Sequence, residues 1–256
     1  MAGWVAIGEM RYPSECETCL RERTDWCSAF LAQPLRTSRC DSKKAWKSHR
    51  VVNAGERIVS NGEVSDGVLV IARGWGYRFL SLPDGRRQII NFLLPGDLLS
   101  VTSLFEKRFN CSADALTEVH IVELGREEIR SRIAGSAKLQ EKWQEAIACQ
   151  IASAEELLFV IGRGTSEERV ANMILHLVRR ITERMSVREG RYRLPVNLPH
   201  MADTVGLTPE HVCRMLTRFR KRGIFGLSKG CLEVFDFAAL ERAGHLNTMP
   251  MLASSS

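Results

Sequence analysis

The chain has no long apolar run, and its uninterrupted hydrophobic stretches contain only several residues each. A helix that crosses a bilayer needs about 20 mainly apolar residues, so the sequence predicts no membrane span. Acidic and basic residues interrupt the opening segment, where an export signal would need an apolar core. We therefore expect a cytoplasmic protein whose eight cysteines are reduced thiols, metal ligands or redox sensors and not a disulfide framework.

Signatures of catalysis are also absent. No glycine-rich phosphate loop, Ser/His/Asp set or pair of catalytic carboxylates stands out. The six histidines are scattered, and no two of them have the spacing of metal ligands. We expect neither an enzyme nor a histidine metal site.

The composition does suit a folded protein with a polyanionic partner. The chain has 256 residues and a mass of 28.8 kDa, which is enough for two modest domains. A hydrophobic content of 45% is sufficient for real cores. The net charge of +6 permits binding to a polyanion, and much of the basic excess lies in the last third of the chain.

The most informative stretch is LPHMADTVGLTPEHVCRMLTR, residues 198–218, which predicts a helix-turn-helix. Ala202 is small enough for two helices to cross closely, and Gly206 stands where the turn needs a residue that tolerates positive φ. Thr208 is suited to cap the second helix, and Val212 then points back at the first. The second helix has the character of a DNA-reading helix.

The opposite side of that second helix carries polar residues at helical spacing. An arginine there can donate two hydrogen bonds to guanine, and a glutamate can accept from cytosine. The helix continues into further basic residues, which suit phosphate contact. The residues that we predict to contact DNA are Thr208, Glu210, His211, Cys213, Arg214 and Arg218.

A hairpin is predicted directly after this helix. Residues 224–227 and 231–235 have the pattern of strands and are joined by Ser228-Lys229-Gly230, so the motif becomes a winged helix. The alternative is a solvated basic helix that packs on a core. Basic face, turn and wing together favour double-stranded DNA as the partner.

Residues 51–124 have a different pattern, in which glycines separate short β-like runs. Residues 68–71 predict a buried strand. Residues 77–79 and 88–92 flank the turn Pro83-Asp84-Gly85 and predict a hairpin. Several short strands at this spacing indicate a small barrel or sandwich.

Residues 136–161 switch to a helical period, with apolar positions at steps of three and four. Such a seam is typical of a helix that pairs with a second copy, so we expect a homodimer; the alternative is packing on the chain's own β-domain. The seam contains Trp143, Ile147, Gln150 or Ile151, Ala154, Leu158 and Ile161.

Glycines mark the end of that helix. Gly162-Arg163-Gly164 is predicted to break it and to act as a hinge. Thr165 and Glu168 have the spacing of a capping box, which predicts that the next helix begins there. Cys149 and Cys231 are expected to be ordinary core thiols.

A β-roll, a long helix, a glycine hinge and a winged helix in this order resemble the Crp/Fnr superfamily of bacterial transcription regulators. The matching motifs are Leu94-Pro95-Gly96-Asp97, Glu167-Glu168-Arg169, Gly206-Leu207-Thr208 and Glu210-x2-Cys213-Arg214. The resemblance implies an α+β fold with an N-terminal cyclic-nucleotide-binding-like β-roll (jelly roll), a long dimerisation helix and a C-terminal winged helix-turn-helix.

The resemblance also implies a function. A homodimer would bind a palindromic TTGAT-like site, with Glu210 and Arg214 reading its G·C pairs, and would contact RNA polymerase. Oxygen or redox is the implied signal. The expected division of the chain is a Cys-rich segment 1–50, a β-roll sensor domain 51–130, a dimerisation helix and hinge 131–163, a DNA-binding domain 164–246 and a flexible tail 247–256.

Nucleotide-binding members of the family carry Gly-Glu for the ribose and Arg-Ser or Arg-Thr for the cyclic phosphate. Ser100-Val101 and Cys111-Ser112 stand at the corresponding positions. The loss of both carboxylate and guanidinium predicts that no cyclic nucleotide binds. A regulator whose β-roll takes another small ligand is the rival hypothesis, with which Gly96-Asp97 is compatible.

Cys16, Cys19 and Cys27 place three thiols in a short segment, as in sites for soft metals. The oxygen-responsive branch holds a [4Fe-4S] cluster with a similar trio and one further cysteine from the β-roll. At the expected fourth position this chain has Val122, which leaves Cys111 or, alternatively, Cys40 as fourth ligand. Zinc, free thiols and a FixK-like regulator without a cofactor stay open beside the cluster.

Cys213 is a separate redox candidate. It stands where the oxygen-responsive branch usually has serine, and Arg214 and His211 are close enough in sequence to favour its thiolate. Oxidation would add bulk or charge to the reading face and weaken DNA binding. The alternative is a serine-to-cysteine replacement that only tunes base contact.

Overall fold

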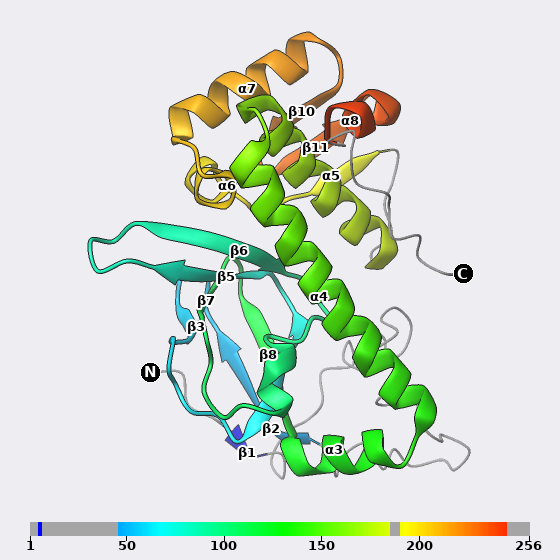
Figure 1. The fold of residues 1–256 in the computed structure, drawn as a ribbon. Helices are drawn as coiled ribbons and strands as arrows, with labels where there is room; N and C mark the ends of the chain where they lie inside the picture. Colours follow the sequence, from blue (N-terminus) through cyan, green and yellow to red (C-terminus); the bar gives the residue numbers. More distant parts are fainter. Residues whose placement is uncertain (1–4, 7–45, 185–189, 245–256) are drawn as a thin grey trace. The chain divides into compact units, whose positions relative to one another are not determined.

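The computed structural model describes residues 5–6, 46–184 and 190–244 (Figure 1). The chain divides into two compact units, residues 1–153 and residues 154–256. Within the described ranges, no helix is both long enough and apolar enough to cross a membrane. The predicted α+β fold class is confirmed.

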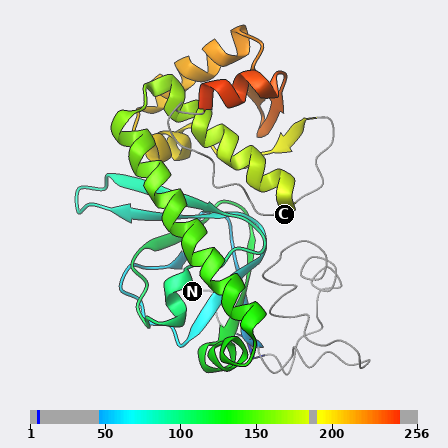
Figure 2. The same cartoon turned by 45° about the vertical axis from the view of Figure 1, so that its right-hand side comes forward.

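The first unit is built on two four-stranded antiparallel sheets with the orders β1-β2-β8-β4 and β3-β7-β5-β6 (Figures 1 and 2). The predicted β-roll is therefore present, and the predicted hairpin is formed by β5 and β6. The strands and the short helix between them are β1 (Val5–Ala6), β2 (Trp46–Val52), β3 (Arg57–Val59), β4 (Gly67–Arg73), β5 (Gly76–Ser81), β6 (Arg87–Leu93), η3 (Val101–Leu104), β7 (Ser112–Ala115) and β8 (Val119–Gly125).

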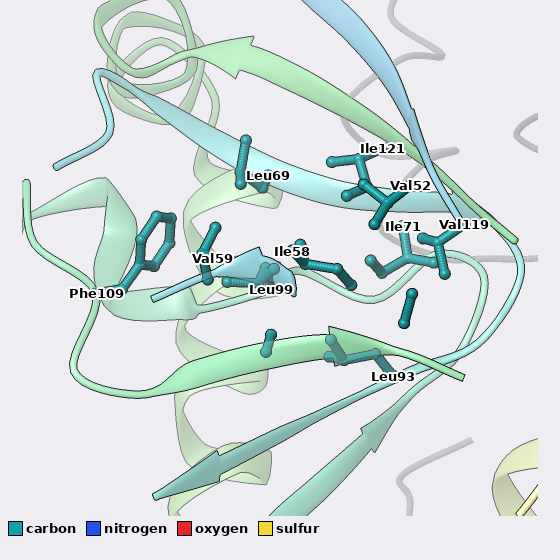
Figure 3. Packing of buried hydrophobic residues seen from close by; sticks show 12 residues of the cluster. Val52, Ile58, Val59, Leu69, Ile71, Leu93, Leu99, Phe109, Val119 and Ile121 are labelled. Atoms are coloured by element: carbon teal, nitrogen blue, oxygen red, sulfur yellow. The ribbon is translucent and has the colours of Figure 1, made fainter. Parts of the chain in front are cut away.

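The core of the roll lies between the two sheets, where side chains from both sheets meet (Figure 3). Alternate residues of a strand point to opposite faces, so β4 contributes Leu69 and Ile71 and β8 contributes Val119 and Ile121. Ile58 from β3 reaches them from the facing sheet. This burial of branched aliphatic side chains is what holds the two sheets together.

A second apolar cluster forms on the outer side of β4 and β8. Two helices supply its other half, α3 (Arg126–Ala134) and the first turns of α4 (Ala137–Arg163). Trp143, which the sequence pattern assigns to the dimer seam, is buried in this cluster instead. The reason is periodicity: a helix that packs on a sheet and a helix that pairs with a copy of itself both show apolar steps of three and four.

The predicted break at Gly162-Arg163-Gly164 is shifted, because α4 continues through Arg163. Gly162 lies within the helix, and a Cβ there would meet no atom within 4 Å. Gly164 is the true end: its N–H donates to the carbonyl of Val160 at 2.9 Å, and a Cβ would lie only 2.6 Å from that oxygen.

The next helix, α5 (Ser166–Arg184), begins with the predicted capping box. The backbone N–H of Thr165 donates to Oε2 of Glu168 at 2.7 Å, and the backbone N–H of Glu168 donates to Oγ1 of Thr165 at 3.3 Å. Two N–H groups that a helix start leaves unpaired are thereby satisfied.

The rest of the second unit is the winged helix. A three-stranded antiparallel sheet of order β10-β11-β9 follows the helix-turn-helix, and the predicted wing is its β10–β11 hairpin. The elements are β9 (Arg191–Arg193), α6 (Leu198–Val205), α7 (Pro209–Lys221), β10 (Phe225–Ser228), β11 (Cys231–Val234) and α8 (Phe237–Gly244).

The two glycines at the end of α4 generate a stability prediction. Gly164→Ala forces a Cβ against the Val160 carbonyl and is expected to destabilise the second unit by about 1–3 kcal/mol. Gly162→Ala, the matched control, adds a good helix former in open space and is expected to stabilise by up to about 1 kcal/mol. Scanning calorimetry of both variants measures the difference, and equal effects would show that Gly164 is not sterically required.

Candidate nucleic-acid interface

The first helix of the motif, α6, has defined caps at both ends. The side chain of Asn197 accepts a hydrogen bond from the backbone N–H of His200 at 3.0 Å. Gly206 ends the helix with φ 66° and ψ 40°, and its N–H donates to the carbonyl of Ala202. The glycine expected at the turn is therefore required by its left-handed backbone conformation.

The second helix, α7, starts at the predicted cap. Oγ1 of Thr208 accepts from the backbone N–H of His211 at 3.3 Å, which uses that side-chain oxygen within the protein. Val212 and Ala202 are both buried, as expected for the crossing of α6 and α7. Phe219 is buried as well and stacks on Phe225 of β10, with ring centroids 4.7 Å apart.

The remaining side of α7 faces outward. Glu210, Arg214 and Arg218 are exposed and follow one another at four-residue steps, which places them on one face of the helix. Cys213 is exposed beside them, whereas His211 is only half-exposed. The structure thus brings the predicted reading residues together, and it adds Lys221, exposed in the last turn, which the sequence pattern marked only as part of a basic run.

The charge of Glu210 is set by the start of the helix. A backbone hydrogen bond in the first turn holds the pKa of Glu210 below its ordinary value, and the Thr208 side chain and the Arg214 charge act in the same direction. The carboxylate of a glutamate is ionised at neutral pH, and the lowered pKa keeps Glu210 an acceptor in more acidic solution as well. An ionised Glu210 one turn before a cationic Arg214 offers an acceptor and a donor to base edges in a groove.

The wing turns sharply at its tip. Lys229 has φ 49° and Gly230 has φ 71°, so the turn holds an exposed lysine in a left-handed conformation. Cys231 is paired with Ser228 next to this tip and is exposed, which contradicts the expectation of a core thiol. Cys149 on α4 is exposed too, because it lies about half a turn around the helix from the partly buried Ile147.

In the β-roll, the structure places an arginine where none was predicted. Cys111 is 1% exposed, and its Sγ accepts a hydrogen bond from Nε of Arg78, on β5, at 3.2 Å. Arg78 is itself only 5% exposed. Pairing of β5 with β7 places this guanidinium beside Cys111, a neighbour that the sequence pattern does not reveal.

In the loop before η3, Asp97 and Ser100 form hydrogen bonds with groups close to them in the sequence. Oδ2 of Asp97 accepts from the backbone N–H of Leu94 at 2.8 Å, which closes the turn at Gly96. Ser100 is buried, and its Oγ lies 2.9 Å from Oγ1 of Thr102. Ser100 and Val101, which we predict to stand at the ribose-binding positions of nucleotide-binding relatives, supply no carboxylate.

Cys16, Cys19, Cys27 and Cys40 lie outside the described residues. In the part of the chain that the structure does describe, no group of three or more His, Cys, Asp or Glu residues is placed to hold a metal ion. Cys111, the other candidate for fourth ligand, is described: its sulfur is buried and accepts a hydrogen bond from the Arg78 guanidinium.

Each of the two units matches a known protein family model. Residues 49–136 match the family model of the cyclic nucleotide-binding domain, and residues 168–243 match that of the Crp-like helix-turn-helix domain. A probable transcriptional activator of Rhizobium leguminosarum bv. viciae is 30% identical over 231 residues, which cover 90% of this chain and 93% of the relative.

Two further proteins extend the comparison. The nitrogen fixation regulation protein FixK of Bradyrhizobium diazoefficiens is 26% identical, with 88% of this chain and 92% of that protein covered. The solved structure of FixK2 from Bradyrhizobium japonicum superposes with a TM-score of 0.68 at 25% identity and covers 77% of this chain and 96% of its own. The similarity therefore includes both units and the order in which they occur.

Proposed function

The chain belongs to the Crp/Fnr family of DNA-binding transcriptional regulators, and we propose that it binds a palindromic TTGAT-like site as a homodimer in an oxygen or redox response. The observation that carries the proposal is the exposed face of α7, where Glu210 and Arg214 stand one turn apart above a buried apolar side. The similar proteins are named as transcriptional activators and regulators, so we assign no catalytic activity.

Base recognition is assigned to the first two turns of α7. Arg214 donates two parallel hydrogen bonds to guanine, and the ionised Glu210 accepts from the amino group of cytosine. The exposed residues Arg218 and Lys221 lie further along the same face and suit contact with phosphate oxygens. The exposed Lys229 at the tip of the wing adds a second basic position.

The test is a substitution that removes one reader. Arg214→Ala is expected to lose about 1–3 kcal/mol of binding to a duplex with two TTGAT-like half-sites and to relax base preference at one position. Fluorescence anisotropy on a set of single-base variants of the duplex measures both effects. Arg242→Ala, an exposed arginine on α8, is the matched control for loss of charge. Unchanged affinity and preference in Arg214→Ala would show that α7 does not read the site in this way.

Dimerisation is assigned to α4 beyond the turns that pack on the roll. Ile151 is 54% exposed and Leu158 is 75% exposed, and Ala154 is exposed between them. Their spacing of three and four residues places them on one apolar stripe of α4. Exposure of such a stripe to water is unfavourable, and the same stripe of a second copy of the chain would cover it. A two-fold dimer would present two α7 helices to two half-sites about one turn of DNA apart.

Leu158→Glu is expected to place a charge in that seam and to raise the dimer dissociation constant by at least about 100-fold. Cys149→Glu puts the same charge on another face of α4 and is expected to leave the dimer intact. Sedimentation velocity over a range of concentrations distinguishes them. A Leu158→Glu variant that dimerises like the wild type would place the dimer contact elsewhere.

Redox sensing is assigned to Cys213. Its exposed thiol lies on the reading face beside Arg214, where an oxidant can reach it. The thiolate sulfur attacks one oxygen of a peroxide, the O–O bond breaks and the leaving hydroxide is protonated to water, which gives a sulfenic acid. The added oxygen then stands between α7 and the DNA groove. A cluster held by Cys16, Cys19, Cys27 and either Cys111 or Cys40 is the alternative source of the signal.

Metal analysis of anaerobically purified protein separates the two sources. We expect metal-free protein whose DNA affinity falls by about tenfold after peroxide treatment, and a Cys213→Ser variant that does not respond. About four irons and four acid-labile sulfides per chain, lost in air together with DNA binding, would instead assign sensing to a cluster.

The remaining assignments follow from the same function. A regulator of transcription acts in the bacterial cytoplasm, where DNA and RNA polymerase are, and RNA polymerase is the protein partner that we assign. No cyclic nucleotide is assigned as ligand, because Ser100 and Val101 offer no carboxylate for a ribose.

A further inference from the structure

Between α4 and α5, a single guanidinium connects two elements of the DNA-binding unit. Nε of Arg169 donates to the carbonyl oxygen of Gly164 at 2.9 Å, where α4 ends. Nη1 of the same side chain donates to the carbonyl of Val205, the last residue of α6, at 3.4 Å. Arg169 thereby uses two orphan carbonyls of two different helix ends.

A second connection comes from the same turn of α5. Glu167 forms an ion pair and hydrogen bond with Arg222, the residue that caps the C-terminal end of α7. Its backbone N–H closes α7 onto the carbonyl of Arg218, so this side chain is tied to the reading helix. The first turn of α5 therefore contacts the ends of both helices of the motif.

The space around Arg169 is confined by glycine positions. A Cβ on Gly164 would lie 3.3 Å from Cγ of Arg169, and a Cβ on Gly206 would lie 3.8 Å from its Nη1. The same Cβ on Gly206 would lie 3.8 Å from Cγ2 of Ile161, in the last turn of α4. The end of α4, the first turn of α5 and the turn of the motif thus meet around one side chain.

This arrangement contrasts with a free hinge. The last turns of α4, from residue 154, belong to the same compact unit as α7. The glycine-containing segment that the sequence suggests as a hinge is bonded through Gly164 to Arg169. A shift of the end of α4 against a second copy would consequently move α7 with it.

We infer that Arg169 is a positioning residue that, together with the Glu167–Arg222 pair, holds the reading helix at a set position relative to the dimerisation helix and so determines the spacing of half-sites that the dimer accepts. The inference rests on the proposed dimeric binding to two half-sites. One added base pair displaces a half-site by about 3.4 Å along the DNA and rotates it about the axis, so only a stiff connection discriminates against it.

The test measures dissociation constants on duplexes that carry the same two half-sites with the spacing changed by one base pair in either direction. The wild type is expected to lose about tenfold or more in affinity on each altered duplex, the scale of one badly placed base contact. Arg169→Met removes both hydrogen bonds and is expected to lose only about threefold, with its base preference within a half-site unchanged. Arg169→Lys, which retains one donor, falls between them.

Three further single variants and one double variant separate the positioning role from effects of charge and of folding. Arg163→Met removes an exposed arginine from the last turn of α4 and is expected to keep the wild-type spacing preference. Glu167→Arg and Arg222→Glu each break an exposed ion pair, which contributes little to stability, so both variants fold. Each single change is expected to weaken the spacing preference, and the double change to restore it.

The readout is a ratio of affinities, so a general loss of DNA binding cancels. Folded Arg169→Met, Glu167→Arg and Arg222→Glu variants that keep the wild-type ratio would overturn the positioning role while leaving the proposed function intact. A wild type that binds one half-site as well as two would overturn the proposed dimeric binding, and the positioning role with it.

Discussion

Burial of one side of α7 is the constraint on which the DNA-binding unit depends. Val212 and Phe219 are buried where α7 packs on α6 and β10. The stacking of Phe219 on Phe225 connects the helix to the wing. Apolar burial of this kind is the main favourable term in folding. Because the apolar residues of α7 recur at helical steps, they lie on one side of the helix, and their burial fixes which side faces the core. The polar residues of α7, Glu210 and Arg214 among them, are left on the outside by the same packing.

Apolar burial also holds the β-roll together, but here a charged side chain is buried with the apolar ones. The inner side chains of the roll are mainly aliphatic, yet Arg78 is buried beside Cys111. A buried guanidinium needs acceptors, and in the described residues its hydrogen bond goes to a sulfur, which is a weak acceptor. Pairing of β5 with β7 brings this cation and this thiol together.

One part of the long helix α4 packs on the roll, and another part is the proposed dimer contact. Both produce the same period of apolar residues, so the sequence pattern cannot distinguish them. Leu139 and Trp143 pack on the outer side of the roll, whereas Ile151 and Leu158, about two and four turns beyond Trp143, remain exposed. At its far end, contacts of Arg169 with Gly164 and Val205 join the helix to the motif. The same helix can thus connect the proposed dimer contact to the placement of the reading helix.

Local signals in the sequence were enough for the capping box at Thr165, the left-handed turn at Gly206 and the wing, because each depends on residues only a few positions apart. They were also enough for the family and its fold class. Only the tertiary structure decided the burial of Trp143, the exposure of Cys149 and Cys231 and the contacts of Arg78 and Arg169. These features depend on which strand or helix end packs against each residue. Contacts between residues distant in the sequence produce no periodic pattern from which they could be predicted.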